Sequence, residues 1–252
     1  MDWGSLAGLL LALFALVLGQ WVEGGQLGSL FQPAALIVVF GGTLGSVLLQ
    51  SGLEGLLRGL RMVNLAFTPS RAFYPALLDT IQSWSMTARM EGFLHLERFI
   101  DAHPDPFIAK GLRMVVDGVA PGTILEILNI EISSYERDQR QAIKVWESAG
   151  GYAPTIGILG AVLGLIRVME NLADPTLLGS GIAVAFVATI YGVGLANLVC
   201  LPIANKIKQH VQIEILKREM LAEAFTSIGR GENLLLIRER MSSHWQQLTR
   251  EG

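Results

Sequence analysis

The sequence has almost no charged side chains in its four long apolar segments, which lie at about residues 6–18, 34–49, 150–170 and 181–204. No Asp or Glu lies deep in any of them. Each segment, with its flanks, is close to the ~20 residues that a helix needs to cross a bilayer. The pattern predicts an all-α membrane protein with four transmembrane helices. If an ion crosses the membrane here, its carboxylate carrier must come from another chain.

Other scarcities exclude whole classes of function. The only cysteine, Cys200, lies in an apolar run, which excludes a disulfide framework and a cysteine-based metal site. A net charge of -3 leaves no broad basic face for nucleic acid. The four histidines lie outside the apolar segments, and neither HExxH nor GxSxG occurs, so an intramembrane hydrolase or other enzyme is not expected. We expect no cofactor and no metal.

The first apolar segment resembles a signal peptide in length but lacks the basic region that precedes one. A second apolar segment follows at once. We therefore expect a retained transmembrane hairpin at residues 1–50, with Trp3 and Trp21 at the two membrane interfaces.

Basic residues predict the orientation of the chain. Residues 1–57 contain no Lys or Arg, and the remaining flanks of the apolar segments are basic: Arg58, Arg61, Arg140, Lys144, Lys206 and Lys208. The positive-inside rule places these flanks in the cytoplasm. The expected divisions are then a cytoplasmic helical domain at 51–148, a second transmembrane pair at 149–205 and a cytoplasmic C-terminal helical segment at 206–252.

The hydrophilic segments read as helices. Apolar residues recur every three to five positions from Phe73 to Ile100, and again from Ile124 to Trp146. Pro121-Gly122 predicts a turn before a new helix, and Gly229-Arg230-Gly231 predicts a helix end. The two blocks are expected to form one helical cytoplasmic base.

Small residues form a stripe along each of the last two apolar segments. The stripes are Gly157, Gly160, Ala161 and Gly164 in the third, and Gly181, Ala185, Ala188, Gly192 and Ala196 in the fourth. Such stripes favour close helix packing. Together with the hydroxyls of Thr155, Thr189 and Tyr191 they could also border an ion path, although such hydroxyls more often bond to their own or a neighbouring helix.

Two prolines, Pro154 and Pro202, lie at the expected cytoplasmic ends of these segments. Proline removes a backbone donor and kinks a helix or marks its end. Helix termination is the simpler interpretation for Pro154, since Gly150-Gly151 precede it. A hinge at matching membrane depth is the alternative.

Several stretches together resemble the MotA/PomA family of flagellar stator subunits, most closely its MotC-type branch. They are residues 152–166, Ala173-Asp174-Pro175, residues 183–192 and 201–204, and Gly41-Gly42-Thr43. The resemblance implies a homopentamer around two copies of a MotB-like, single-span, peptidoglycan-binding partner, whose membrane aspartate carries the ion. It implies a multi-pass protein of the bacterial inner membrane, with both large hydrophilic segments cytoplasmic and surrounded by membrane lipid at its spans.

The resemblance also implies functional residues. Pro154 and Pro202 match prolines linked to ion flow and torque, and Thr189 matches a hydroxyl near the aspartate. The ion-path candidates are Pro154, Thr155, Gly157, Ala161, Ala188, Thr189, Tyr191 and Pro202. Sodium-driven members carry hydroxyl residues where this chain has Ala161 and Ala188. Sodium needs such oxygens to replace its hydration shell, so proton coupling is expected.

Residues 89–97 resemble the family segment that engages the rotor protein FliG, and Arg89 and Glu97 match its paired charges. On a straight helix these side chains point about 80° apart. They are otherwise ordinary solvated charges of little value to stability. The alternative function is a TolQ/ExbB-type proton-channel subunit, which usually has three spans and lacks this hairpin and long cytoplasmic insert.

Overall fold

The computed structural model describes residues 3–25, 27–66, 74–172 and 175–251, and these are almost entirely helical. Phe73 and the Ala173-Asp174 pair lie outside the described residues. The N-terminal elements are α1 (Trp3–Val22), the 3₁₀ turn η1 (Leu27–Leu30), α2 (Pro33–Leu36), the π-helical turn η2 (Ile37–Gly41), α3 (Gly42–Arg61) and α4 (Val63–Ala66). Then follow α5 (Tyr74–Met90), the 3₁₀ turn η3 (Phe93–Leu96), α6 (Glu97–Ile100) and α7 (Pro106–Val116). The last are α8 (Pro121–Glu170), α9 (Pro175–Gly194), the π-helical turn η4 (Leu195–Cys200), α10 (Leu201–Gly229) and α11 (Leu234–Glu251).

The chain forms two compact units with three boundaries between them, of which two fall inside α8 and α10 and the third falls between residues 69 and 70. The first unit contains residues 1–69 and 139–210, and the second contains residues 70–138 and 211–252. Within the described part of the chain, three helical stretches are long and apolar enough to cross a membrane: Leu27–Ala66, Pro121–Glu170 and Leu178–Gly229. The first apolar segment forms a shorter apolar helix, Ala7–Val22. The expected all-helical fold with four apolar helices is therefore present.

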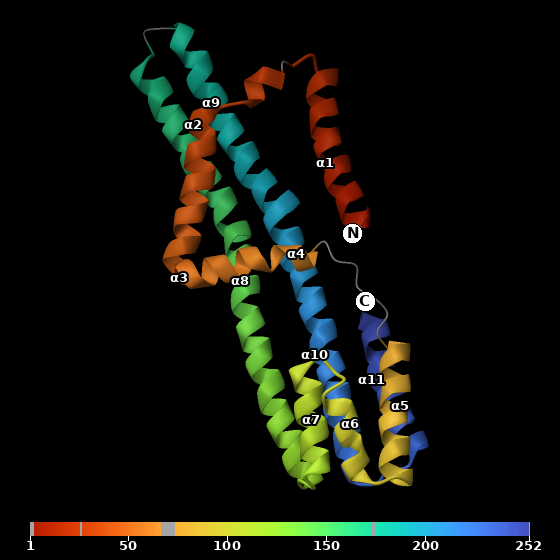
Figure 1. Cartoon of the computed structure of the whole chain (residues 1–252). Coiled ribbons are helices and arrows are strands. Elements are labelled where there is room, and N and C mark those ends of the chain that lie inside the picture. The colour runs from red at the N-terminus through yellow and green to blue at the C-terminus, as the bar shows by residue number, and fades with distance from the viewer. Residues whose placement is uncertain (1–2, 26, 67–73, 173–174, 252) are drawn as a thin grey trace. The chain divides into compact units, whose positions relative to one another are not determined.

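A bend at Gly52 turns the end of α3 sideways, across α8 and toward α4 (Figure 1). Gly52 has φ 66°, a conformation open to glycine and strained for other residues. Beyond the bend, a Cβ at Gly59 would lie 2.9 Å from Val145 of α8. The indole N–H of Trp146 donates to the carbonyl of Gly59 at 2.9 Å. The glycines thus let this segment bend and then lie directly on α8.

The two prolines lie inside continuous helical segments. Pro154 does not end α8, which continues to Glu170, so helix termination is wrong for this residue. Pro202 follows the π-helical turn η4, in which the N–H of Leu201 donates to the carbonyl of Ala196, five residues back. The wider turn gives room for the proline ring, which would otherwise clash with the carbonyl of Leu198. Cys200, within η4, is 2% exposed.

The second unit has its own core, in which Trp84 of α5 stacks on Phe225 of α10 at 5.6 Å between ring centroids. A Cβ at Gly111 of α7 would lie 2.2 Å from the Phe225 ring, so only glycine allows α7 this close to α10. Asp105 caps α7 by accepting from the N–H of Phe107 at 3.0 Å, and Pro106 occupies the first turn. The helix start at Pro121 and the helix end at Gly229 lie where the sequence predicts them.

The apolar run from Phe73 to Ile100 does not form one helix. α5 ends at Met90, and Gly92 has φ 94°, which redirects the chain into η3 and α6. Arg89 therefore lies at the end of α5, whereas Glu97 begins α6. The expected 80° angle on a straight helix is wrong.

Candidate functional site

The small-residue stripes of α8 and α9 pack against each other with almost no space between the backbones. A Cβ at Gly157 would lie 2.9 Å from the carbonyl oxygen of Ala188, and one at Gly192 would lie 2.5 Å from that of Ala153. Further along, a Cβ at Gly164 would lie 2.8 Å from the nitrogen of Ala185. We call this contact the α8–α9 seam. It confirms the close-packing interpretation of the stripes, and Gly157 and Ala188 lie within it.

Tyr191 ties α9 to the start of the second apolar segment. Its hydroxyl donates to the carbonyl of Leu30 and accepts from the N–H of Gln32 at 3.3 Å. Gln32 precedes α2 and provides no side-chain cap, so this phenol supplies a partner that the helix start otherwise lacks. No local pattern indicates this contact, because the partners of Tyr191 are about 160 residues away along the chain.

We expect Tyr191→Phe to lower the free energy of unfolding by roughly 1–3 kcal/mol, because two partly buried backbone groups lose their partner. Thermal denaturation of the purified protein in detergent would measure the loss. Tyr152→Phe is the matched control, since the structure shows no hydrogen bond to the Tyr152 hydroxyl among the described residues. Equal stability of the two variants would show that the hydrogen bonds of the Tyr191 hydroxyl do not stabilise the fold.

The threonine hydroxyls donate to their own helices. Thr155 donates to the carbonyl of Tyr152 at 2.8 Å, and Thr189 donates to that of Ala185 at 3.3 Å. Each oxygen keeps its lone pairs for a donor from outside the helix. Thr155 is exposed on α8, and Thr189 is half-buried on α9. These hydroxyls can accept a hydrogen bond but have no proton left to donate without breaking the bond to the helix.

The seam has two flanks, and one of them is covered. On the first flank, Val187 and Tyr191 of α9 pack in one cluster with Ala35 of α2 and Val39 of η2. Thr189 points about 200° away from Tyr191 around α9, on the second flank. On α8, a Cβ at Gly160 would lie 3.5 Å from Val38 of η2, whereas Ala161, about 100° further round, lies on the other side of the seam.

Ala161 and Thr189 therefore border the flank away from α2 and η2, which we call the open flank. Of the other candidates, Gly157 and Ala188 lie inside the seam, Tyr191 on the covered flank, and Thr155 on the exposed face of α8. Pro154 lies in α8 next to the seam residue Ala153, and Pro202 lies in the first turn of α10, directly after η4. Residues 151–166 and 175–205 contain no Asp, Glu, His, Lys or Arg, so the seam and both flanks are uncharged.

The start of α3 carries one buried hydroxyl for which the described residues provide no hydrogen-bond partner. Thr43, at the start of α3, is 5% exposed, and its hydroxyl has no hydrogen-bond partner among the described residues. A lone hydroxyl costs free energy in an apolar interior. We expect Thr43→Val to raise the free energy of unfolding by about 1 kcal/mol. Thermal denaturation of the purified protein would show it, and a loss of stability would indicate that the hydroxyl has a partner in the assembled protein.

In the second unit, Arg89 and Glu97 are both exposed on either side of the break at Gly92. The Arg89 guanidinium donates to the carbonyl of Gly231 at 3.3 Å, in the turn between α10 and α11. Large apolar side chains lie between the two charges in sequence, and Met90 is 79% and Leu94 72% exposed. Opposite charges around exposed apolar groups are the composition of a partner-binding surface.

The chain is similar to known proteins over nearly its whole length. Residues 100–220 match the MotA/TolQ/ExbB proton channel family, and residues 6–92 match the N-terminal region of motility protein A. Motility protein A of Bacillus subtilis is 31% identical over 96% of this chain and 90% of its own length. The fold matches that of C. jejuni MotAB with a TM-score of 0.90 over 97% of this chain and 96% of that one, at 23% identity.

The solved flagellar MotAB stator complex from Bacillus subtilis is 31% identical, with a TM-score of 0.85 over 93% of this chain and 92% of that one. Similarity at this level over both units, together with the match to the motility protein A N-terminal region, separates this chain from TolQ and ExbB relatives, with which it shares one family description. The chain belongs to the motility protein A family.

Proposed function

We propose that this protein is the membrane subunit of a flagellar stator, which couples proton flow across the inner membrane to torque on the rotor. The observation that carries the proposal is the α8–α9 seam, which is tightly packed, borders an uncharged open flank and has no carboxylate in residues 151–166 or 175–205. A solved relative is titled a flagellar stator complex of two proteins, MotA and MotB. The protein is accordingly a multi-pass membrane protein and a motor component rather than an enzyme.

The missing carboxylate would come from a MotB-like partner with one span and a peptidoglycan-binding domain. The open flank, with Ala161 and the acceptor oxygen of Thr189, is where such a partner helix fits, because α2 and η2 cover the opposite flank. A protonated carboxyl could donate to Thr189, whereas an ionised one could not. Alternate protonation would therefore change the favoured contact and rotate a ring of five subunits around two partners.

The charged flanks support an orientation in which both hydrophilic segments are cytoplasmic. The exposed charges Arg89 and Glu97 would then meet the rotor protein FliG. The split of these charges between α5 and α6 supports this contact, because it lets them approach a partner from two elements. Membership of the MotC-type branch remains a prediction from the sequence.

Expression of this chain alone should give almost no proton flux, because no residue of the seam or its flanks can carry a proton across the membrane. Co-expression with its partner should give flux, measured as acidification of the cytoplasm after an acid pulse. A partner whose membrane aspartate is replaced by asparagine is the control. Appreciable flux from the chain alone would overturn the proposal and would favour an independent channel.

Reversal of either exposed charge, Arg89→Glu or Glu97→Lys, should reduce the torque on the rotor and leave ring assembly and proton flux unchanged. Exposed charges contribute little to the stability of the fold, but they strongly affect how a protein meets its binding partner. Torque is measured from the rotation of tethered cells. Asp79→Lys, on the same helix about 15 Å away, is the control. A complementary reversal on the rotor should restore part of the torque, and loss of assembly in Arg89→Glu would show that its bond to Gly231 is structural.

A further inference from the structure

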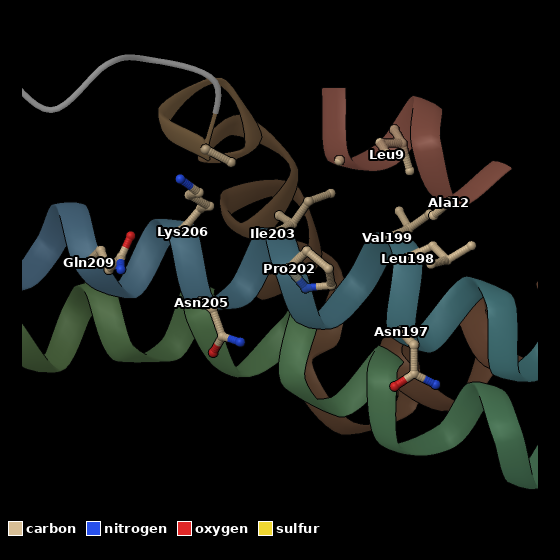
Figure 2. A pocket seen from close by; sticks show the side chains of 12 residues that line it. Leu9, Ala12, Asn197, Leu198, Val199, Pro202, Ile203, Asn205, Lys206 and Gln209 are labelled. Carbon is tan, nitrogen blue, oxygen red and sulfur yellow. The ribbon is translucent and has the colours of Figure 1, made fainter. Parts of the chain in front are cut away.

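Two features of the chain differ in how well they select a partner. A cavity of about 500 Å³ lies in the first unit between α1 and the η4–α10 segment, and its mainly apolar walls include Leu9, Val199 and Ile203 (Figure 2). Apolar walls accept hydrocarbon of many kinds, so they do not select one ligand. Directional contacts that bear on a partner lie instead in the second unit, at the break between α5 and α6.

A single glycine, Gly92, joins the two helices of the α5–α6 corner, which we define as residues 87–98. Its φ of 94° turns the chain between Arg89 on α5 and Glu97 on α6. Leu96 is fully buried and fixes the inner face of the corner on the core of the second unit. Apolar packing of this kind is non-directional, so it sets the depth of the corner better than its angle. A directional contact across the glycine is needed to keep the two charges in one arrangement.

Arg98 of α6 makes such a contact. Its guanidinium donates to the hydroxyl oxygen of Thr87 at 3.0 Å and to Oε1 of Glu91 at 3.4 Å, and its Nη1 lies 3.2 Å from Oε2 of Glu91. The guanidinium also lies 5.0 Å from the centroid of the Phe99 ring. A planar fork held by two side chains and a ring has one favoured orientation. One side chain thus spans Gly92 and joins α6 to the end of α5.

We propose that Arg98 is a positioning residue for the rotor contact, because it holds the α5–α6 corner at the angle at which Arg89 and Glu97 meet one partner surface. This inference rests on the proposed function, of which the rotor contact is a part. Arg89 has its own support in its bond to the carbonyl of Gly231. Arg98 supplies the corresponding support beside Glu97. A surface that is preorganised in this way loses less conformational entropy when it binds.

Hydrogen–deuterium exchange of the full chain, purified with its partner subunit, tests the corner without the rotor. Arg98→Gln should speed amide exchange in residues 91–98 by about two- to fivefold, the range that one exposed ion pair gives. Lys110→Gln is the matched control, because it breaks the similarly exposed pair of Lys110 with Glu131, which joins α7 to α8 outside the corner. Equal exchange in the native chain and in Arg98→Gln would overturn the proposal.

Torque, measured from the rotation of tethered cells, separates positioning from a direct contact of Arg98 with the rotor. Arg98→Gln and Glu91→Gln should each reduce torque by about two- to fivefold, with ring assembly and proton flux unchanged. The double variant should lose no more than either single variant, because both break the same contact. The exchanged pair, Arg98→Glu with Glu91→Arg, should recover torque, since it restores opposite charges across Gly92 and lets the Thr87 hydroxyl donate to the new carboxylate.

The remaining outcomes are distinguishable from one another. Additive losses, or an exchanged pair that stays defective, would place Arg98 on the rotor itself and overturn the positioning role. Loss of ring assembly in Arg98→Gln would overturn it in favour of a role in folding. Reduced torque in Arg89→Glu and Glu97→Lys, with normal torque in Arg98→Gln, would overturn this inference alone. Normal torque in all three variants would overturn the rotor contact and this inference with it.

Discussion

Gly192→Ala should abolish motility and assembly of the subunit into its ring. The added Cβ would lie 2.5 Å from the carbonyl oxygen of Ala153 and 3.0 Å from the Cα of Gly157, and both are backbone atoms that cannot rotate away. The seam must open, and overpacking of this kind costs about 1–3 kcal/mol in each subunit. Size-exclusion chromatography of the purified complex, alongside swimming on soft agar, would measure the effect.

Gly194→Ala is the control for this substitution. Gly194 lies two residues after Gly192 in α9, and a Cβ at Gly194 would meet no atom within 4 Å. Alanine is also the better helix former by up to about 1 kcal/mol, so this variant should assemble normally or become slightly more stable. Normal swimming in Gly192→Ala would show that the seam can open without loss of function.

Swimming that depends on this stator should continue in sodium-free medium and stop when a protonophore collapses the proton gradient. The physical reason is that the open flank offers few oxygen ligands to a sodium ion, since Ala161 has a methyl group there and Thr189 has a single hydroxyl. Swimming speed is measured in a strain without any other stator. Loss of motility in sodium-free medium, with the proton gradient intact, would contradict proton coupling.

The two alanines matched to hydroxyl residues of sodium-driven relatives should behave differently. Ala161 lies on the open flank, so Ala161→Ser should assemble and swim. Ala188 is fully buried in the seam, and a Cβ at Gly160 would lie 2.9 Å from its own Cβ. Ala188→Thr should therefore reduce assembly before it affects ion choice. Equal assembly of the two variants would show that Ala188 has more room than the seam indicates.

Periodicity and spacing predicted the parts of the fold that depend on local sequence. The small-residue stripes predicted the seam, since closely approaching backbones in lipid require glycine and alanine on the facing side. Pro121 and Gly229 marked helix ends because each residue acts on its own backbone. These features are present in the structure.

Two kinds of feature could not be predicted from the sequence. One kind is decided by competition between local backbone preferences, and the other depends on contacts between residues that are far apart in the chain. Pro154 with its two preceding glycines looked like a helix end, but backbone groups in an apolar environment have no partners outside the helix, so continuing the helix costs less than ending it. The opposite occurred at Gly92, where the apolar period from Phe73 to Ile100 continues past the glycine but α5 ends at Met90 and Gly92 adopts φ 94°. A hydropathy pattern does not indicate that a residue has a positive φ.

The candidate site was predicted in composition but not in arrangement. Residues chosen as one set, including Gly157, Thr155 and Tyr191, lie in the seam, on an exposed face and on the covered flank respectively. Spacing on one helix can give relative angles, but it cannot say which flank another helix covers. The contact of Tyr191 with Leu30 and Gln32 supplies that information, and only the folded chain contains it.

The burial of Cys200 has a practical consequence for chemistry on this chain. It is the only sulfhydryl in the sequence, and at 2% exposure it is closed to a bulky maleimide. The native chain needs no cysteine removal before labelling. A cysteine introduced between α1 and α2, or at the break between α5 and α6, would then be the only reactive site, and a membrane-impermeant reagent applied to intact cells would show on which side of the membrane each one lies.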